Sequence, residues 1–261
     1  MLFAIDIGNS HTVCGVYDDD QLRAHWRIST NTGRTRDELR AMLTTLFMSQ
    51  NGLETQQITH AIIASVVPAM TSVFEETIAA LFSVQAKVVG PGLRTGMPIR
   101  YEDPREVGAD RIVNAVGAYQ KWPMGLIVVD FGTATTFDVV HPDGAYLGGV
   151  ICPGIQISSE ALFSRAAKLP KVAFRRPPTV VGRNTTTSIQ SGLVYGYVSR
   201  VEGLIHRLKD ELGFECKVIA TGGLASEVAE NTDAIEHVDA LLTLTGLRAI
   251  HILNVNTKTE A

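Results

Sequence analysis

The sequence predicts a duplicated α/β fold, with two related domains and a cleft between their equivalent hairpins. An apolar strand that ends in Asp-x-Gly occurs twice, as Asp6-Ile7-Gly8 and as Asp130-Phe131-Gly132. Each copy is followed by a second β-like run and then by a turn signal, the pattern of a β-hairpin. The two copies open the two halves of the chain, and alternating strand and helix patterns follow both of them.

The first half is expected to form a mixed sheet covered by helices and to make a domain of residues 1–121. Thr35 and Glu38 have the spacing of a capping box, which marks the start of its first helix. The expected elements after the first hairpin are strands over 24–29, 60–67 and 87–89 and helices over 35–48, 69–82 and 110–121.

The second half repeats this order of strands and helices and is expected to make a domain of residues 122–261. Its expected elements are strands over 126–129, 137–140, 145–151 and 217–220 and helices over 154–167, 187–212 and 240–253. The apolar residues of the longest helix keep a period of 3.6. Gly192 and Gly196 lie on or beside that stripe, a spacing that lets another backbone approach closely.

Composition limits the classes of function. The chain has 261 residues, 45% of them hydrophobic and 19% charged, as in an ordinary globular protein. A net charge of −4 gives no electrostatic footprint for nucleic acid or for an anionic membrane. The three cysteines are widely spaced, and no apolar run approaches membrane-spanning length. These features, and the lack of a basic leader before the first strand, predict a soluble cytoplasmic protein.

The repeated hairpin has the chemistry of a phosphate site. Glycine lets the backbone turn sharply and approach a ligand, and successive N–H groups with Ser or Thr hydroxyls form an anion-binding concavity. The Asp at each strand end suits a bound cation or an ordered water. One copy alone would be weak evidence, because Asp and Gly favour turns in any case. Two copies with matching flanks favour a pair of hairpins that hold a polyphosphate–metal complex.

A second candidate site is Gly108-Ala109-Asp110-Arg111, at the expected start of a helix, with Tyr101 shortly before it. Asp110 is either the N-cap of that helix or a carboxylate that accepts a hydroxyl proton during phosphoryl transfer. Arg111 is either a surface ion-pair partner or a group that steers an anionic part of a substrate.

Two further segments are ambiguous on sequence alone. The run from Gly182 to Thr185 has the pattern of a helix start capped by Asn or Thr. The glycine pair in Thr221-Gly222-Gly223 either admits a flat ligand such as a nucleoside or only turns the chain. The sequence contains no Walker P-loop, zinc-ligand spacing or nucleophile elbow.

Taken together, these segments resemble the type III pantothenate kinases of the acetate kinase/sugar kinase/Hsp70/actin superfamily. The resemblance covers nearly the whole chain, in the family's order. It implies duplicated actin-like, ribonuclease H-like domains, each a mixed central sheet flanked by helices. The segments that carry it are Asp6–Asn9, Gly108–Arg111, Asp130–Thr136, Gly148–Gly154, Ala167–Pro170, Gly182–Thr185, Ser191–Tyr197 and Thr221–Gly223.

The resemblance also implies roles for individual residues. ATP would be bound by Asp6, Ile7, Gly8, Asn9, Ser10, His11, Thr12 and Val13, with Thr133 holding phosphate from the second hairpin. Pantothenate would be bound by Tyr101, Gly108, Ala109, Asp110, Arg111 and Thr185. Asp110 would be the general base, and Asp130 would bind a monovalent cation, K⁺ or NH₄⁺. Mg²⁺ would accompany ATP, and the protein would be a homodimer.

The implied reaction is ATP-dependent phosphorylation of pantothenate to 4'-phosphopantothenate, the first step of coenzyme A biosynthesis. One alternative is a regulatory accessory protein of the same fold that binds nucleotide without kinase activity. Intact Asp110, Arg111 and Thr185 argue against it, and net acidity argues against DNA binding. Another alternative is a kinase for a sugar or a carboxylate, which the Gly108–Arg111 element and the small size disfavour.

Overall fold

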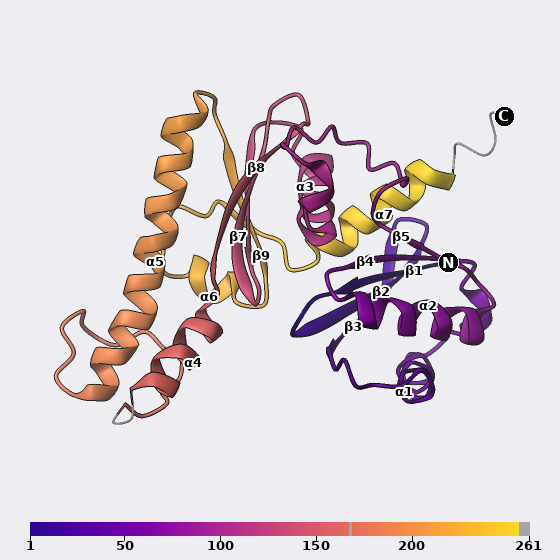
Figure 1. The fold of residues 1–261 in the computed structure, drawn as a ribbon, viewed down its shortest axis with the longest axis horizontal. Helices are drawn as coiled ribbons and strands as arrows, with labels where there is room; N and C mark the ends of the chain where they lie inside the picture. Colours follow the sequence, from indigo (N-terminus) through magenta and orange to yellow (C-terminus); the bar gives the residue numbers. More distant parts are fainter. Residues whose placement is uncertain (167–168, 256–261) are drawn as a thin grey trace. The chain divides into compact units, whose positions relative to one another are not determined.

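A computed structural model describes residues 1–166 and 169–255 of the chain (Figure 1). The chain divides into two compact units. The first contains Met1–Pro123, Gly144–Leu147 and the C-terminal segment from Leu241. The second contains Met124–Asp143 and Gly148–Ala240.

The first unit is built on a five-stranded mixed sheet in the order β3-β2-β1-β4-β5. The central strand β1 pairs antiparallel with β2, which pairs antiparallel with β3. On its other side β1 pairs parallel with β4, which pairs parallel with β5. The bounds are Leu2–Ile7 for β1, His11–Asp18 for β2, Gln21–Ser29 for β3, His60–Ser65 for β4 and Ala86–Val88 for β5.

Helices cover both faces of this sheet. On one face α1 (Arg36–Met48) and α2 (Pro68–Phe82) pack on the odd-numbered side chains of β1 to form an aromatic core. On the other face α7 (Leu242–Val255) lies on β1, β2 and β4 and packs against α3 (Ala109–Lys121). Two short 3-10 helices, η1 (Thr55–Gln57) and η2 (Pro104–Glu106), lie in the connections.

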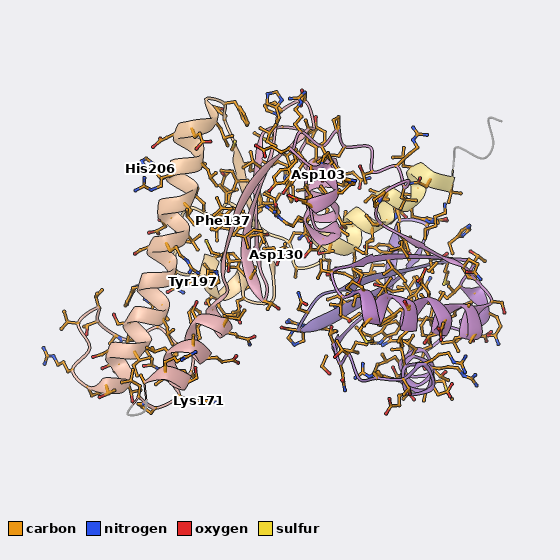
Figure 2. All side chains as sticks on the ribbon, in the orientation of Figure 1. Asp103, Asp130, Phe137, Lys171, Tyr197 and His206 are labelled. Carbon is orange, nitrogen blue, oxygen red and sulfur yellow. The ribbon has the colours of Figure 1, made fainter. Side chains whose placement is uncertain are left out.

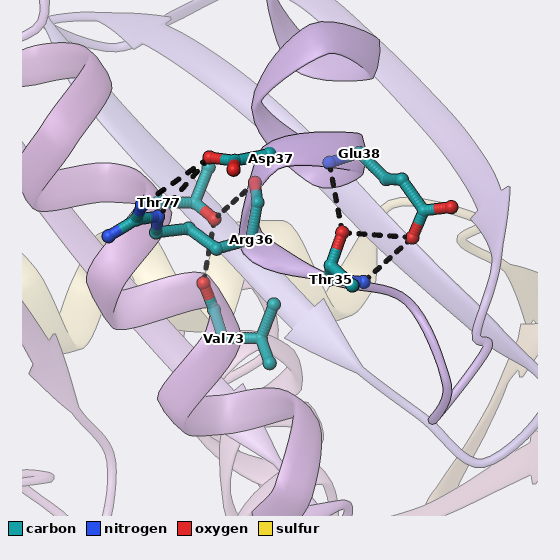
Figure 3. A network of polar contacts seen from close by, with 6 residues as sticks. All are labelled: Thr35, Arg36, Asp37, Glu38, Val73 and Thr77. Carbon is teal, nitrogen blue, oxygen red and sulfur yellow. Dashed lines mark hydrogen bonds and ion pairs between the residues drawn. The ribbon is translucent and has the colours of Figure 1, made fainter.

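The expected capping box is confirmed at the start of α1 (Figure 3). The backbone N–H of Glu38 donates to Thr35 Oγ1, and the backbone N–H of Thr35 donates to Glu38 Oε2 at 2.8 Å. Thr77 of α2 is fully buried, and its hydroxyl donates to the carbonyl oxygen of Val73 at 2.7 Å. It also lies within hydrogen-bonding distance of the Arg36 carbonyl, which connects α2 to the first turn of α1.

The second unit repeats the same sheet. Its order, β10-β9-β6-β7-β8, matches the first sheet strand for strand when it is read in reverse. The central strand β6 pairs antiparallel with β7 and parallel with β9. The bounds are Leu126–Phe131 for β6, Ala134–Val140 for β7, Tyr146–Pro153 for β8, Lys217–Gly222 for β9 and His237–Val238 for β10. The predicted duplication is therefore confirmed.

Three helices cover one face of this second sheet: α4 (Ile155–Arg165), α5 (Thr185–Leu212) and α6 (Ala225–Ala229) (Figure 1). They pack on the odd-numbered side chains of β6, such as Val129 and Phe131, in one apolar cluster. No helix of the described part of the chain is both long and apolar enough to cross a membrane.

The structure differs from the sequence expectations mainly in the last helix. The expected helix over 240–253 is α7, and it joins the first unit because it packs against α3, β1 and β4. The units therefore differ in membership from the expected division at 121/122. The short strand β10 was not expected. The expected helix over 154–167 corresponds to α4, and Ala167 lies outside the described residues.

The contact between α3 and α7 depends on glycine. A Cβ at Gly246 of α7 would overlap the Val113 carbonyl oxygen of α3, whereas a Cβ at Gly203 of α5 would meet open space. Both positions gain helix propensity on substitution by alanine, by about 1 kcal/mol. We expect Gly246→Ala to lower the free energy of unfolding by about 1–3 kcal/mol and the matched Gly203→Ala to raise it. Urea unfolding of both variants measures this, and equal stabilisation would contradict the close helix contact.

Candidate active site

The first hairpin loop is held by backbone bonds and by two threonines. The Gly8 N–H donates to the His11 carbonyl oxygen at 3.0 Å and closes the turn between β1 and β2. Thr30, just after β3, donates its hydroxyl proton to the Gly8 carbonyl oxygen at 2.7 Å. Because the Thr30 hydroxyl has no second proton to donate, the Thr12 hydroxyl must be the donor in its bond to Thr30 Oγ1, at 2.9 Å. The Thr30 N–H bonds the Ser10 carbonyl, so Thr30 braces both sides of the turn.

Charged and polar side chains lie on one face of the sheet beside this loop. Asp6 of β1 is paired with Val13 of β2, and Val13 is paired with Arg27 of β3. Paired residues of neighbouring strands point to the same face, and His11 shares it because it lies two residues before Val13. The side chains of Asp6, His11 and Arg27 therefore lie on the same face of the sheet, next to the loop.

The protonation of His11 follows from its partner. Arg27 Nη2 lies 2.9 Å from His11 Nδ1, and a guanidinium can only donate. His11 Nδ1 must therefore accept, which leaves the proton of the neutral ring on Nε2. Burial, and then the positive charge of Arg27, lower the pKa of His11. The side chain is thus a neutral N–H donor near neutral pH.

Asp110 occupies the first turn of α3. The interpretation of Asp110 as the N-cap is wrong, because Gly108 is the N-cap and Ala109 is the first helical residue. Asp110 Oδ1 accepts the backbone N–H of Arg111 at 2.8 Å, and a Cβ at Gly108 would crowd the same oxygen. Burial raises the pKa of Asp110, and the Arg111 N–H and guanidinium offset that rise only in part. Asp110 is therefore a half-buried carboxylate that binds a proton more readily than an exposed one.

The start of α3 lies at the same end of the first sheet as the hairpin loop. Val66 directly follows β4, and its N–H donates to the Ile7 carbonyl oxygen at 3.1 Å. The Cβ position of Gly108 lies 3.6 Å from Val66 Cγ1. The carboxyl ends of β1 and β4 thus bring together Asp110 and the Gly8 loop, as is usual for ligand sites on parallel strands.

Two tyrosines and an arginine form a stack beside Asp110. The Tyr146 ring is fully buried, with its centroid 6.5 Å from the Tyr101 ring and 5.8 Å from the Arg111 guanidinium carbon. Arg111 is only 7% exposed, so it is not the surface ion-pair partner considered above. The backbone of Tyr146 is fixed by bonds to Pro98 and Arg100. Sequence analysis missed Tyr146, because no local pattern connects it to a site so distant in the chain.

The second hairpin carries Asp130 and Thr133 in the second unit (Figure 2 labels Asp130). The Gly132 N–H donates to the Ala134 carbonyl oxygen at 3.0 Å, and the Gly154 N–H donates to the Thr133 carbonyl oxygen at 3.2 Å. Gly222, at the end of β9, has φ +93° and leaves room for the Asp130 carboxylate, which a Cβ there would overlap. Gly222, the last residue of β9, therefore leaves the space that the Asp130 side chain at the end of β6 occupies.

The segment Gly182–Thr185 forms the capped start of α5, as one interpretation of the sequence predicted. Asn184 is the N-cap, and its Oδ1 accepts the Thr187 N–H at 2.9 Å. Thr185 is the first helical residue and is exposed, outside this capping box. The structure thus places Asp6–Val13, Tyr101 and Gly108–Arg111 in the first unit and Asp130, Thr133 and Thr185 in the second.

Comparison with known proteins identifies the family. The family model for type III pantothenate kinases matches residues 2–207. A type III pantothenate kinase of Myxococcus xanthus is 55% identical over 251 residues, covering 96% of this chain and 98% of the relative. The chain belongs to the type III pantothenate kinase family.

Solved structures agree with the actin-like fold at low sequence identity. A Campylobacter jejuni protein described as a candidate Baf-family transcriptional activator has a TM-score of 0.62 at 18% identity, covering 97% of this chain and 99% of its own. A ROK hexokinase of Thermus thermophilus has a TM-score of 0.52 at 12% identity, covering 98% and 99%. At such identities these likenesses show the fold alone.

The raised pKa of Asp110 predicts the pH dependence of stability. Ionising this carboxyl costs more free energy in the folded state than in the unfolded state. The resulting loss of stability is complete at pH values above the pKa of the folded state and absent below the pKa of the unfolded state. Asp110→Asn removes this cost and keeps an oxygen for the Arg111 N–H. We expect Asp110→Asn to be more stable than the parent protein at neutral pH, by an amount that shrinks as the pH falls through the folded pKa.

Asp103 is the matched control, because its hydrogen bonds from Arg105 lower the pKa of its exposed carboxyl. Its stabilising contribution is present above the unfolded pKa and is lost as the pH falls, so Asp103→Asn should show the opposite sign. Thermal melts from pH 3 to pH 8 (roughly the range over which carboxyl groups titrate) compare the two variants. A loss of stability in Asp110→Asn at neutral pH would contradict the burial argument.

Proposed function

We propose that this protein transfers the γ-phosphoryl group of MgATP to the primary hydroxyl of pantothenate and so catalyses the first step of coenzyme A biosynthesis. Membership of the family supports the reaction. The observation that supports these roles is the half-buried Asp110 carboxylate, at the same sheet end as the Gly8 loop. A base and a phosphate-binding turn in that arrangement suit phosphoryl transfer to an alcohol.

In this proposal the residues Asp6–Val13 bind the phosphates of ATP. Backbone N–H groups of the turn and the Ser10 hydroxyl face the anion, and His11 offers its Nε2–H beside Arg27. Asp6 acts near the phosphates that carry Mg²⁺. Thr133 of the second hairpin also binds phosphate through its side chain.

The residues proposed to bind pantothenate are Tyr101, Gly108–Arg111 and Thr185. The Arg111 guanidinium, buried against Tyr146, holds an anionic group of the substrate, and Tyr101 covers its apolar part. Asp110 in its ionised form accepts the hydroxyl proton as the oxygen attacks phosphorus. The transition state is loose, so the main task of Asp110 is to orient the hydroxyl with its carboxylate ionised.

Asp130 is proposed to hold the monovalent cation, K⁺ or NH₄⁺. Among the described residues no group of three or more His, Cys, Asp or Glu side chains could hold a metal ion. A single carboxylate at a strand end, in the space that Gly222 leaves open, fits a weakly bound monovalent ion. When bound, the ion supplies positive charge that offsets the charge of the ATP phosphates.

We also propose a cytoplasmic homodimer with no nucleic-acid or membrane partner. The three cysteines are free, which suits a reducing compartment, and the net charge is −4. Gly192 and Gly196 on α5 are exposed, and a Cβ at either would meet no neighbour in the described part of the chain. A second copy could approach this helix closely.

The reaction is tested by coupled ADP release with pantothenate and MgATP, in K⁺ or in Na⁺ as the sole monovalent cation. We expect pantothenate-dependent turnover in K⁺ and little in Na⁺. Asp110→Asn should keep nucleotide binding and lower turnover by about 10²–10⁴-fold. Near-normal turnover in that variant would remove Asp110 as the base. A folded protein that binds nucleotide but turns over in neither salt would favour the regulatory alternative.

The dimer is tested by light scattering on Gly196→Arg, with Gly203→Arg as the matched control on the same helix. Both introduce a long charged side chain at an open glycine position. We expect the parent protein and Gly203→Arg to be dimers and Gly196→Arg to shift to monomer. A monomeric parent protein, or a fully dimeric Gly196→Arg, would contradict an interface at this part of α5.

A further inference from the structure

The long helix α5 is bonded to the second hairpin through a buried pair of hydroxyls. Tyr197 of α5 and Thr135 of β7 share a hydrogen bond between their side-chain oxygens. Tyr197 is 7% exposed and Thr135 is fully buried. The Tyr197 ring also packs against Phe131, with 6.1 Å between ring centroids (Figure 2 labels Tyr197 on α5).

A second connection runs from the same face of α5 to the same hairpin. Arg200, one turn after Tyr197, lies over its ring at 4.5 Å and donates from Nη2 to the Pro153 carbonyl oxygen at 2.9 Å. The next residue, Gly154, donates its N–H to the Thr133 carbonyl oxygen. A Cβ at Gly154 would overlap that oxygen, so the hairpin and the end of β8 are in close contact.

Thr135 in the second hairpin is equivalent to Thr12 in the first hairpin. Thr135 is paired with Phe131, the last residue of β6, just as Thr12 is paired with Ile7, the last residue of β1. Both threonines are buried, and each uses its hydroxyl to brace its turn. Thr12 bonds to Thr30 on its own sheet, whereas Thr135 bonds to a helix.

The Tyr197 phenol is neutral near neutral pH. Burial raises the pKa of Tyr197, and the bond with Thr135 and the charge of Arg200 offset that rise only in part. In the bond between Tyr197 and Thr135 either hydroxyl can be the donor.

We propose that Tyr197 and Arg200 are positioning residues that set the geometry of the hairpin 130–135 for the triphosphate of ATP and for the monovalent cation. The inference rests on the proposed roles of Thr133 and Asp130. Neither Tyr197 nor Arg200 need touch a ligand. They act through Thr135 and through the Pro153–Gly154 backbone, which fix the turn that carries both binding residues.

The test removes one hydroxyl at a time. Tyr197→Phe keeps the ring and its contact with Arg200, and Thr135→Val keeps the shape of the threonine. We expect each variant to raise the KM for MgATP and the K⁺ concentration for half-maximal activation by about threefold to tenfold, as expected for one lost hydrogen bond. The KM for pantothenate should change less than about twofold, because its proposed site is set mainly by α3.

Two comparisons separate positioning from general destabilisation. The double variant should be no worse than either single variant, because both remove the same bond. Tyr195→Phe is the matched control, since the Tyr195 hydroxyl donates to the Pro177 carbonyl oxygen and not to the hairpin. Tyr195→Phe should leave the KM for MgATP and the K⁺ dependence unchanged, whatever its effect on melting temperature.

The outcomes distinguish the two proposals. If the parent protein shows no pantothenate-dependent turnover, the proposed function fails, and MgATP binding by calorimetry in K⁺ and in Na⁺ still measures the effect of Tyr197→Phe. If the parent protein is active and Tyr197→Phe lowers only the melting temperature, with the KM for MgATP and the K⁺ dependence unchanged, the positioning role is overturned. Additive losses in the double variant would also overturn it.

Discussion

The arrangement of each candidate site depends on the parallel pairing of the central strand of each sheet with its neighbour, β1 with β4 and β6 with β9. Parallel strands end at the same edge, so the residues after both strands meet there. In the first unit this brings Val66 and the start of α3 to the Gly8 loop. In the second it brings Gly222 against Asp130. A shift of register by one residue would turn both aspartates into the apolar cores on α1 and α2 or on α5.

The burial of Asp110 illustrates a compromise between stability and chemistry. A carboxylate removed from water costs the folded state free energy, and the Arg111 N–H and guanidinium recover only part of it. The same burial gives the proposed base a fixed position in the first turn of a helix, where it needs no reorganisation. Functional sites commonly keep such locally unfavourable groups, and the apolar cores of the unit supply the compensating stability.

The two hairpins share a backbone plan but differ in what supports them. In both, a threonine opposite the last residue of the central strand is buried. The first hairpin is supported by Thr30, which directly follows the strand β3 of the same sheet. The second receives it from Tyr197 on α5, so anything that moves this helix also acts on the turn with Thr133. The two copies of the turn are therefore held by different parts of the chain.

The resemblance to a known family supplied the proposed site residues, whereas the sequence by itself determined the strand–turn–strand repeat and the capped start of α1. These features are local, since a buried strand, a turn glycine and a capping box are encoded within about ten residues of chain. Only the tertiary structure decided that Gly108 and not Asp110 caps α3, that Arg111 is buried on Tyr146, and that α7 belongs to the first unit. It also revealed the contacts of Thr30, Gly222 and Tyr197. Each of these depends on contacts between residues far apart in the chain, which are fixed by sheet register and helix packing rather than by local pattern.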